Sequence, residues 1–137
     1  MGRKRWLVSW IGNADHEAAE GTRPEHPGPI ATALKAADRF DRVVLLTNYP
    51  KPRSSKFCKW LAATARYPES SVVLSAVRLD SPIDYAEIYR CVSEQLIGLS
   101  LPSDDVDVTF HLSPGTPAMA AIWIILSKTR FPAGLIQ

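Results

Sequence analysis

The chain has 137 residues, of which 46% are hydrophobic and 22% charged, and its formal net charge is +2 at pH 7. These values are typical of a single globular domain that is large enough to bury a real core. The small net charge excludes nucleic-acid binding through an overall basic surface, so we expect any anion-binding site to be local.

Neither a membrane span nor a cysteine-based site is expected. The longest apolar run, residues 118–126, is too short to cross a bilayer. The basic N-terminus leads into a short apolar segment without a cleavage signature, which indicates a cytoplasmic protein. Cys58 and Cys91 are far apart and form no Cys-x-x-Cys pair, which disfavours a disulfide or a zinc site.

Apolar runs and amphipathic segments alternate along the first half of the chain. The compact apolar run 6–11 is typical of a strand buried on both faces of a parallel sheet. Ser54 or Ser55 is the expected cap of a helix that continues through Arg66. The predicted elements of this half are a strand over 6–11, a long polar loop over 13–28, a helix over 29–40, a strand over 42–46 and the capped helix.

Apolar runs and amphipathic segments also alternate along the second half of the chain. The segment Ser81-Pro82-Ile83-Asp84 has the form of a capping box with proline at the first helical position. Its elements are a strand over 71–79, a helix from this box to about Leu99, a strand over 106–112, a helix over 117–128 and a strand beginning within 133–137.

This alternation predicts a Rossmann-like, three-layer α/β/α fold with a mostly parallel sheet and helices on both faces. Ligands of such folds bind beyond the carboxyl ends of the strands, where the strand order reverses. Four segments are expected to meet at that edge: residues 12–15, residues 47–49, the vicinity of Arg78, and residues 113–116.

The most informative of these segments is the turn Ser113-Pro114-Gly115-Thr116. Thr116 is a good N-cap, and the proline that follows it fits the first helical position. Gly115 lets the backbone approach a ligand closely, and unpaired N–H groups at a helix start form a seat for a phosphate or another anion. We therefore predict that the turn and Met119 contact a ligand, with a well-capped loop that binds nothing as the alternative.

Polar residues after the first two predicted strands form a second group of candidates. Asn13 and Asp15 are expected to contact a ribose or a base, although both residue types also commonly end strands. The loop after them is long enough to act as a lid over the ligand. Thr47 and Asn48 close the second strand and are included among the predicted ligand contacts.

A basic cluster that includes Lys51 and Arg53 follows the second strand. It is either an ordinary solvated surface or a set of phosphate contacts, with Tyr49 beside it as a stacking partner for a base.

Several catalytic signatures are absent from the sequence. No Gly-x-Gly-x-x-Gly follows the first strand and no P-loop is present, which disfavours a dinucleotide-dependent oxidoreductase and a P-loop ATPase. The histidines lack metal-ligand spacing, and His111 is expected to be a hydrogen-bonded core residue. Ser113 has no evident base and no Gly-x-Ser-x-Gly motif surrounds it. We therefore assign no catalytic residue, metal or cofactor.

Three segments resemble a known family: residues 9–13, residues 45–50 and residues 111–119, with Gly28-Pro29-Ile30 beside them. They are similar to the CARF domain, the CRISPR-associated Rossmann fold. The likeness is greatest to the N-terminal sensor domains of RtcR-type sigma-54-dependent transcriptional activators, which regulate RNA repair. Many CRISPR-linked members carry Gly-Gly-Thr-Lys in the last turn, whereas this chain reads Pro114-Gly115-Thr116-Pro117 and lacks the lysine.

The resemblance implies a homodimeric sensor in which two copies surround one pocket. Its ligand would be a cyclic oligoadenylate or a processed RNA end, and residues 1–137 would be a single sensing domain at the N-terminus of a longer regulator. That domain would control an effector absent from this chain, such as a sigma-54-dependent AAA+ ATPase. A metal-independent ring nuclease that cleaves cyclic oligoadenylate, and a dimerisation module without a ligand, are the alternatives.

Overall fold

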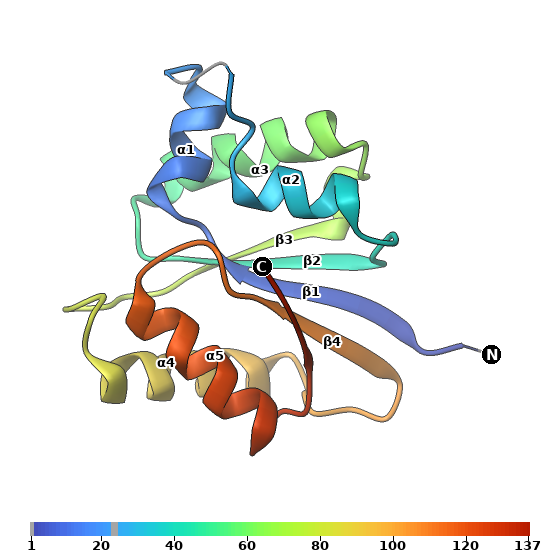
Figure 1. Cartoon of the computed structure of the whole chain (residues 1–137), viewed down its shortest axis with the longest axis vertical. Coiled ribbons are helices and arrows are strands. Elements are labelled where there is room, and N and C mark those ends of the chain that lie inside the picture. Colours follow the sequence, from blue (N-terminus) through green and yellow to red (C-terminus); the bar gives the residue numbers. More distant parts are fainter. Residues whose placement is uncertain (1, 23–24) are drawn as a thin grey trace.

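A computed structural model of the chain describes residues 2–22 and 25–137 (Figure 1). The strands form one parallel sheet with the order β3-β2-β1-β4-β5. Helices α1, α2 and α3 cover one face of the sheet, and α4 and α5 cover the other (Figure 1). The elements are β1 (Lys4–Trp10), α1 (Asn13–Glu20), α2 (Pro29–Ala36), β2 (Arg42–Thr47), α3 (Lys51–Ala65), a 3-10 turn (Glu69–Ser71), β3 (Val72–Ala76), α4 (Tyr85–Gly98), β4 (Val106–His111), α5 (Pro117–Lys128) and β5 (Gly134–Ile136). The predicted three-layer α/β architecture is confirmed.

Strand β1 lies at the centre of the sheet and at the reversal of its order. The chain runs outward from β1 through β2 to β3, and then returns to the other side of β1 as β4. Val8 is therefore paired with Val44 of β2 on one side and with Phe110 of β4 on the other. In folds of this kind, the expected place for a ligand is the crevice between the carboxyl ends of the two strands at the reversal, here β1 and β4.

The core consists of two apolar layers that share the sheet. Alternate residues of β1 point to opposite faces, so Leu7 packs under α2 and α3 while Val8 packs under α4 and α5. On the α5 side, the rings of Phe110 and Trp123 stack with their centroids 4.4 Å apart. Burial on both faces explains why the central strands read as continuous apolar runs instead of alternating patterns.

The polar stretch 13–28 is the main departure from the predicted elements. Residues Asn13–Glu20 form helix α1, which begins after Gly12 and ends at Gly21, a residue with φ +77°. The predicted loop, and the lid built on it, are therefore wrong for this part of the stretch; Arg23 and Pro24 lie outside the described residues. The helix was missed because its buried face includes Asp15 and His16, and polar residues give no apolar periodicity.

Two predicted helix starts also differ. Helix α3 begins at Lys51 after Pro50, so neither Ser54 nor Ser55 caps it. Helix α4 is capped by Asp84, whose carboxylate accepts the Glu87 N–H at 3.1 Å. The predicted cap of α5 is confirmed, since the Thr116 hydroxyl accepts the Met119 N–H at 3.2 Å. Within the described residues, no helix combines the length and the apolar character that crossing a membrane requires.

Candidate ligand-binding site

A pocket of about 360 Å³ opens at the carboxyl ends of β1 and β4, where the strand order reverses. Its volume falls within the range typical of small-molecule sites. The pocket is lined by Ile11, Gly12, Asn13, Ala14, Asp15, Pro29, Asn48, Tyr49, Pro82, Ser113, Pro114, Gly115, Thr116 and Met119. The structure therefore brings together the turns after β1, β2 and β4, as the parallel topology predicts.

Most of the residues predicted as ligand contacts line this pocket, and three do not. Thr47 is fully buried and is not among the lining residues, and its contact with a ligand stays a prediction. Lys51 and Arg53 lie outside the lining, and their contact with phosphate stays a prediction. The segment before α4 reaches the pocket through Pro82 and not through Arg78, whose guanidinium is exposed beside Asp80.

The floor of the pocket is formed where two turns meet backbone to backbone. A Cβ atom placed on Gly12 would lie 3.0 Å from the Gly115 backbone nitrogen and 3.5 Å from the Pro114 Cα. Gly115 itself has φ +89°, and a Cβ there would lie 2.5 Å from the Met119 sulfur. Both positions therefore require glycine, one for the close approach and the other for its backbone conformation.

Asp15 holds the first of these turns in place. It is fully buried, and one carboxylate oxygen accepts the Gly12 N–H at 2.9 Å while the other accepts the Ile30 N–H at 3.0 Å. Burial raises the pKa of Asp15 to about 6, and the two backbone hydrogen bonds oppose that rise. Since both oxygens already accept backbone protons, Asp15 positions the turn after β1 against the start of α2.

A chain of hydrogen bonds fixes the other side of Gly12. The Gly12 carbonyl lies 3.1 Å from His16 Nδ1, and because a carbonyl only accepts, Nδ1 carries the proton. His16 Nε2 then accepts from the Ser54 hydroxyl at 2.9 Å, and Ser54 accepts from the Thr47 hydroxyl at 2.8 Å. Thr47 in turn accepts the Tyr49 N–H at 3.1 Å. This chain ties the turn after β2 to the turn after β1.

The Ser54–His16 pair has the contact distance of a nucleophile and its base, yet its surroundings give it a structural role. Ser54 is fully buried and His16 is 1% exposed, so no substrate reaches either side chain. Burial, with a smaller contribution from Arg53, lowers the pKa of His16 and keeps the ring neutral near pH 7. We therefore assign His16 and Ser54 a positioning role. No local sequence signal marks their contact, because the two residues are 38 positions apart.

Arg53 is engaged beside the pocket instead of lining it. Its guanidinium donates two hydrogen bonds to Glu20, at 2.7 and 2.9 Å, and lies 5.3 Å from the centre of the Tyr49 ring. The Tyr49 ring also lies 4.7 Å from the His16 ring. These contacts join the end of α1 to the start of α3 and hold the Tyr49 ring at the pocket wall.

Backbone groups dominate the electrostatics of the pocket. Helices α1 and α5 both begin at its lining, so their N-terminal N–H groups and positive dipole ends lie at the pocket. No lysine or arginine is among the lining residues, and Asp15 is the one carboxylate there. The side chains of Ser113 and Asn48 have no hydrogen-bond partner among the described residues. The arrangement suits an anion bound through backbone N–H groups.

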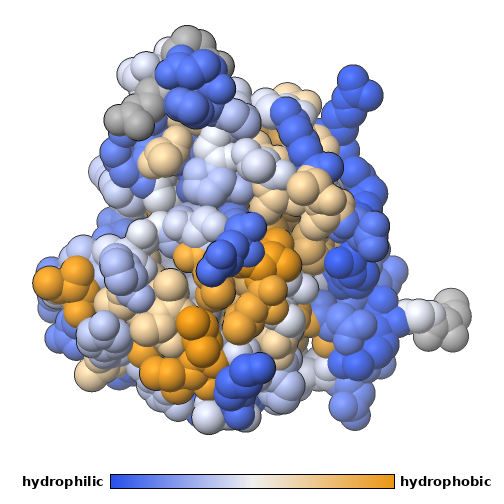
Figure 2. All heavy atoms as spheres, viewed as in Figure 1, coloured by the Kyte–Doolittle hydropathy of each residue, from blue (hydrophilic) through white to orange (hydrophobic). Residues whose placement is uncertain are grey.

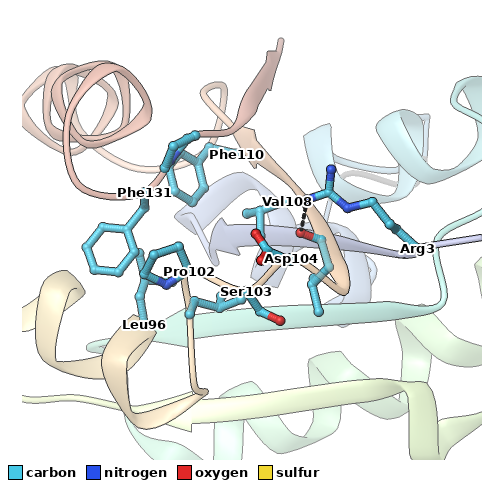
Figure 3. Close-up of a pocket in the computed structure, with 11 residues that line it drawn as sticks. Arg3, Leu96, Pro102, Ser103, Asp104, Val108, Phe110 and Phe131 are labelled. Atoms are coloured by element: carbon cyan, nitrogen blue, oxygen red, sulfur yellow. Dashed lines mark hydrogen bonds between the residues drawn. The ribbon is translucent and has the colours of Figure 1, made fainter.

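A second pocket, of about 330 Å³, lies at the opposite edge of the sheet (Figure 3). Its polar donor, the Arg3 guanidinium, already donates to the Val106 carbonyl at 3.1 Å and pairs with Asp107 at 2.9 Å. Phe110 and Phe131 form part of its apolar wall (Figure 3). Because parallel α/β sheets bind ligands at the carboxyl ends of their strands, the pocket beyond β1 and β4 is the candidate site.

Known proteins are similar to this chain in sequence and in structure. No protein-family profile matches the chain. A stretch of 71 residues, 51% of the chain, is 32% identical to the transcriptional regulatory protein RtcR of Escherichia coli (strain K12), of which it covers 13%. The structure of Enterococcus italicus Csm6 bound to cyclic hexa-2′-fluoro-hexa-dAMP matches 98% of this chain with a TM-score of 0.74 and 16% identity, over 32% of the Csm6 chain.

This chain therefore shares the Rossmann-like fold of that Csm6 structure. The resemblance predicted from residues 9–13 and 111–119 is confirmed. The chain spans about a third of the Csm6 chain and a much smaller share of RtcR. The activities of those whole proteins are therefore not assigned to it.

Gly12→Ala is expected to destabilise the fold by about 1–3 kcal/mol, because the new methyl group would press on the Gly115 backbone, which cannot rotate away. Urea unfolding measures the change. Gly98→Ala is the matched control, since no atom lies within 4 Å of a Cβ placed there. Equal stability of the two variants would contradict the close approach of the turns.

Asp15 makes stability fall as the pH rises. Its pKa is about 6 in the folded chain against an ordinary 3.8, so the folded state binds the proton more tightly and loses stability between those values. His111 acts in the opposite direction, because burial lowers its pKa from 6.5 to about 4. We therefore expect the difference between the free energies of unfolding of wild type and Asp15→Asn to fall by about 2 kcal/mol from pH 4 to pH 7. A difference independent of pH would contradict this role.

Proposed function

We propose that this chain is the ligand-sensing domain of a longer transcriptional regulator. In this proposal it binds an RNA-derived oligonucleotide, either a cyclic oligoadenylate or a processed RNA end, and its occupancy controls an effector domain. The observation that carries the proposal is the pocket at the strand-order reversal, whose floor is backbone and at which two helices begin. Such a floor suits a phosphate group.

The lining also offers contacts for a nucleoside. Tyr49 supplies an aromatic ring for stacking, and its position is fixed by the contacts with His16 and Arg53. Asn48 lies beside Tyr49, and its carboxamide has one hydrogen-bond donor group and one acceptor. An adenine edge has a complementary acceptor and donor, so the two can form a pair of hydrogen bonds. The Csm6 structure that shares this fold holds a cyclic oligoadenylate analogue, and RtcR is a transcriptional regulator, which supports the ligand class and the type of effector.

A homodimer is part of the proposal. A pocket of about 360 Å³ has room for only part of an oligonucleotide, so a second copy is needed to enclose a cyclic ligand. Hydrophobic residues gather on the surface over α4 and α5 (Figure 2). On α5, Ile124 and Ile125 are 43% and 46% exposed, which is unusual for large apolar side chains in the middle of a helix. We propose that this surface forms the contact between copies.

Cleavage of the ligand is not part of the proposal. Asp15 and Tyr49 are the ionisable side chains among the lining residues. Both Asp15 oxygens accept backbone hydrogen bonds, so the carboxylate is not available as a general base. We therefore propose binding, and no cleavage step, for this pocket.

The ligand is tested by thermal denaturation with cyclic tetra- and hexa-adenylate, linear oligoadenylates and RNA ending in a 2′,3′-cyclic phosphate. A ligand at about 100 times its Kd stabilises the fold by about 2.7 kcal/mol, which gives a clear rise in Tm. Ser113→Ala is expected to weaken binding about 10-fold through loss of one hydroxyl contact. Ser70→Ala, an exposed serine outside the pocket lining, is the matched control. No shift with any compound would overturn the proposed function.

The dimer is tested by sedimentation velocity. Wild type is expected to sediment as a dimer, and replacing both Ile124 and Ile125 by Glu is expected to give monomers, because charges would be buried in the contact. Lys128→Glu, an exposed change at the end of the same helix, serves as the control. A monomeric wild type, or a double variant that remains dimeric, would refute this contact.

A further inference from the structure

The segment before α4, residues 80–84, is a short strap that α4 holds at both ends. At its start, the Glu87 carboxylate accepts the N–H groups of Asp80 and Ser81 at 2.8 and 2.9 Å. At its end, the Asp84 carboxylate accepts the Glu87 N–H at 3.1 Å. The strap therefore belongs to α4, although its middle reaches the pocket.

One hydrogen bond connects the middle of the strap to the turn after β4. The Thr116 hydroxyl donates to the Pro82 carbonyl oxygen at 2.6 Å, and Pro82 lines the pocket. Among the hydrogen bonds of the described residues, this is the one that joins residues 80–84 to the turn 113–116. Its short length marks it as a well-formed contact.

The Thr116 hydroxyl has a single proton, and that proton is already in use. The same oxygen accepts the Met119 N–H at 3.2 Å as the cap of α5. An anion bound at the start of α5 can receive the hydroxyl proton only if the Pro82 carbonyl gives it up. Ligand and strap therefore compete for one donor.

We propose that Thr116 couples the pocket to the surface: a bound phosphate takes the hydroxyl proton of Thr116 away from Pro82, and the strap is released. This inference rests on the proposed function, because it needs an anionic ligand at the start of α5. The strap and the first turn of α4 carry Ile83 and Tyr85, which are 67% and 55% exposed. Release of Pro82 thus changes how two large apolar side chains are presented to a neighbouring copy or domain.

Hydrogen–deuterium exchange of the strap tests the coupling, because its amides are hydrogen-bonded. The Ser81 N–H donates to the Glu87 carboxylate, and the N–H groups of Ile83 and Asp84 donate to Ser81. Thr116→Asp is the decisive variant. An aspartate still caps α5, but an ionised carboxylate has no proton to donate to Pro82. Thr116→Ser retains the hydroxyl and is the conservative control.

Without ligand, we expect the strap amides to exchange several-fold faster in Thr116→Asp than in wild type, and at the wild-type rate in Thr116→Ser. Saturating wild type with cyclic hexa-adenylate is expected to raise strap exchange to the rate of Thr116→Asp. The amides of Val43, Val44 and Leu45 in β2, an interior strand of the sheet, are the internal reference and should not change.

The outcomes separate the two proposals. Failure of every compound to bind overturns the proposed function and this inference with it. Binding of cyclic hexa-adenylate that leaves strap exchange unchanged overturns this inference alone. Wild-type strap exchange in a folded Thr116→Asp shows that the Thr116–Pro82 bond does not hold the strap, and it also overturns the coupling.

Discussion

The close approach of Gly12 and Gly115 is the constraint on which the rest of the site depends. Two turns that are about 100 residues apart in the chain touch through their backbones, with no space for a Cβ atom between them. This contact lies where the strand order reverses, so it forms the floor of the crevice that the topology opens. Helices α1 and α5 begin at this floor, so their N-terminal ends lie beside it.

The buried polar residues around Gly12 are explained by this constraint. Asp15 accepts its N–H, and His16 donates to its carbonyl oxygen, so both polar groups of a single peptide segment are fixed. Burying a carboxylate is costly, and the raised pKa of Asp15 shows that the two backbone hydrogen bonds do not fully offset that cost. The site is thus held by interactions that define the position of the turn more than they stabilise the fold.

The parts of this site that sequence predicts are those with local signals. Thr116 and Pro117 mark a helix start by their types and order, and the parallel-sheet rule places that start at the ligand edge. The positioning residues have no such signal, because the contacts of Asp15 with Ile30, and of His16 with Ser54, join separate elements. Helix α1 was hidden for the same reason, since these two polar residues are on its buried side. Pro82 reaches the pocket only because α4 and α5 pack side by side on one face of the sheet.

Pro117 follows Thr116 at the start of α5, and no lysine is among the residues that line the pocket. A lysine would attract phosphate over a long range and would have three protons to donate, whereas Thr116 has one. With no cation among the lining residues, each hydrogen-bond donor at the start of α5 matters more to the ligand. The Thr116 hydroxyl can donate its proton either to a phosphate or to the Pro82 carbonyl oxygen. In this proposal, ligand binding and the position of the strap therefore depend on each other. A pocket without a lining cation is suited to sensing in this proposal, because the bound phosphate depends on a hydroxyl that is also part of a hydrogen bond of the fold.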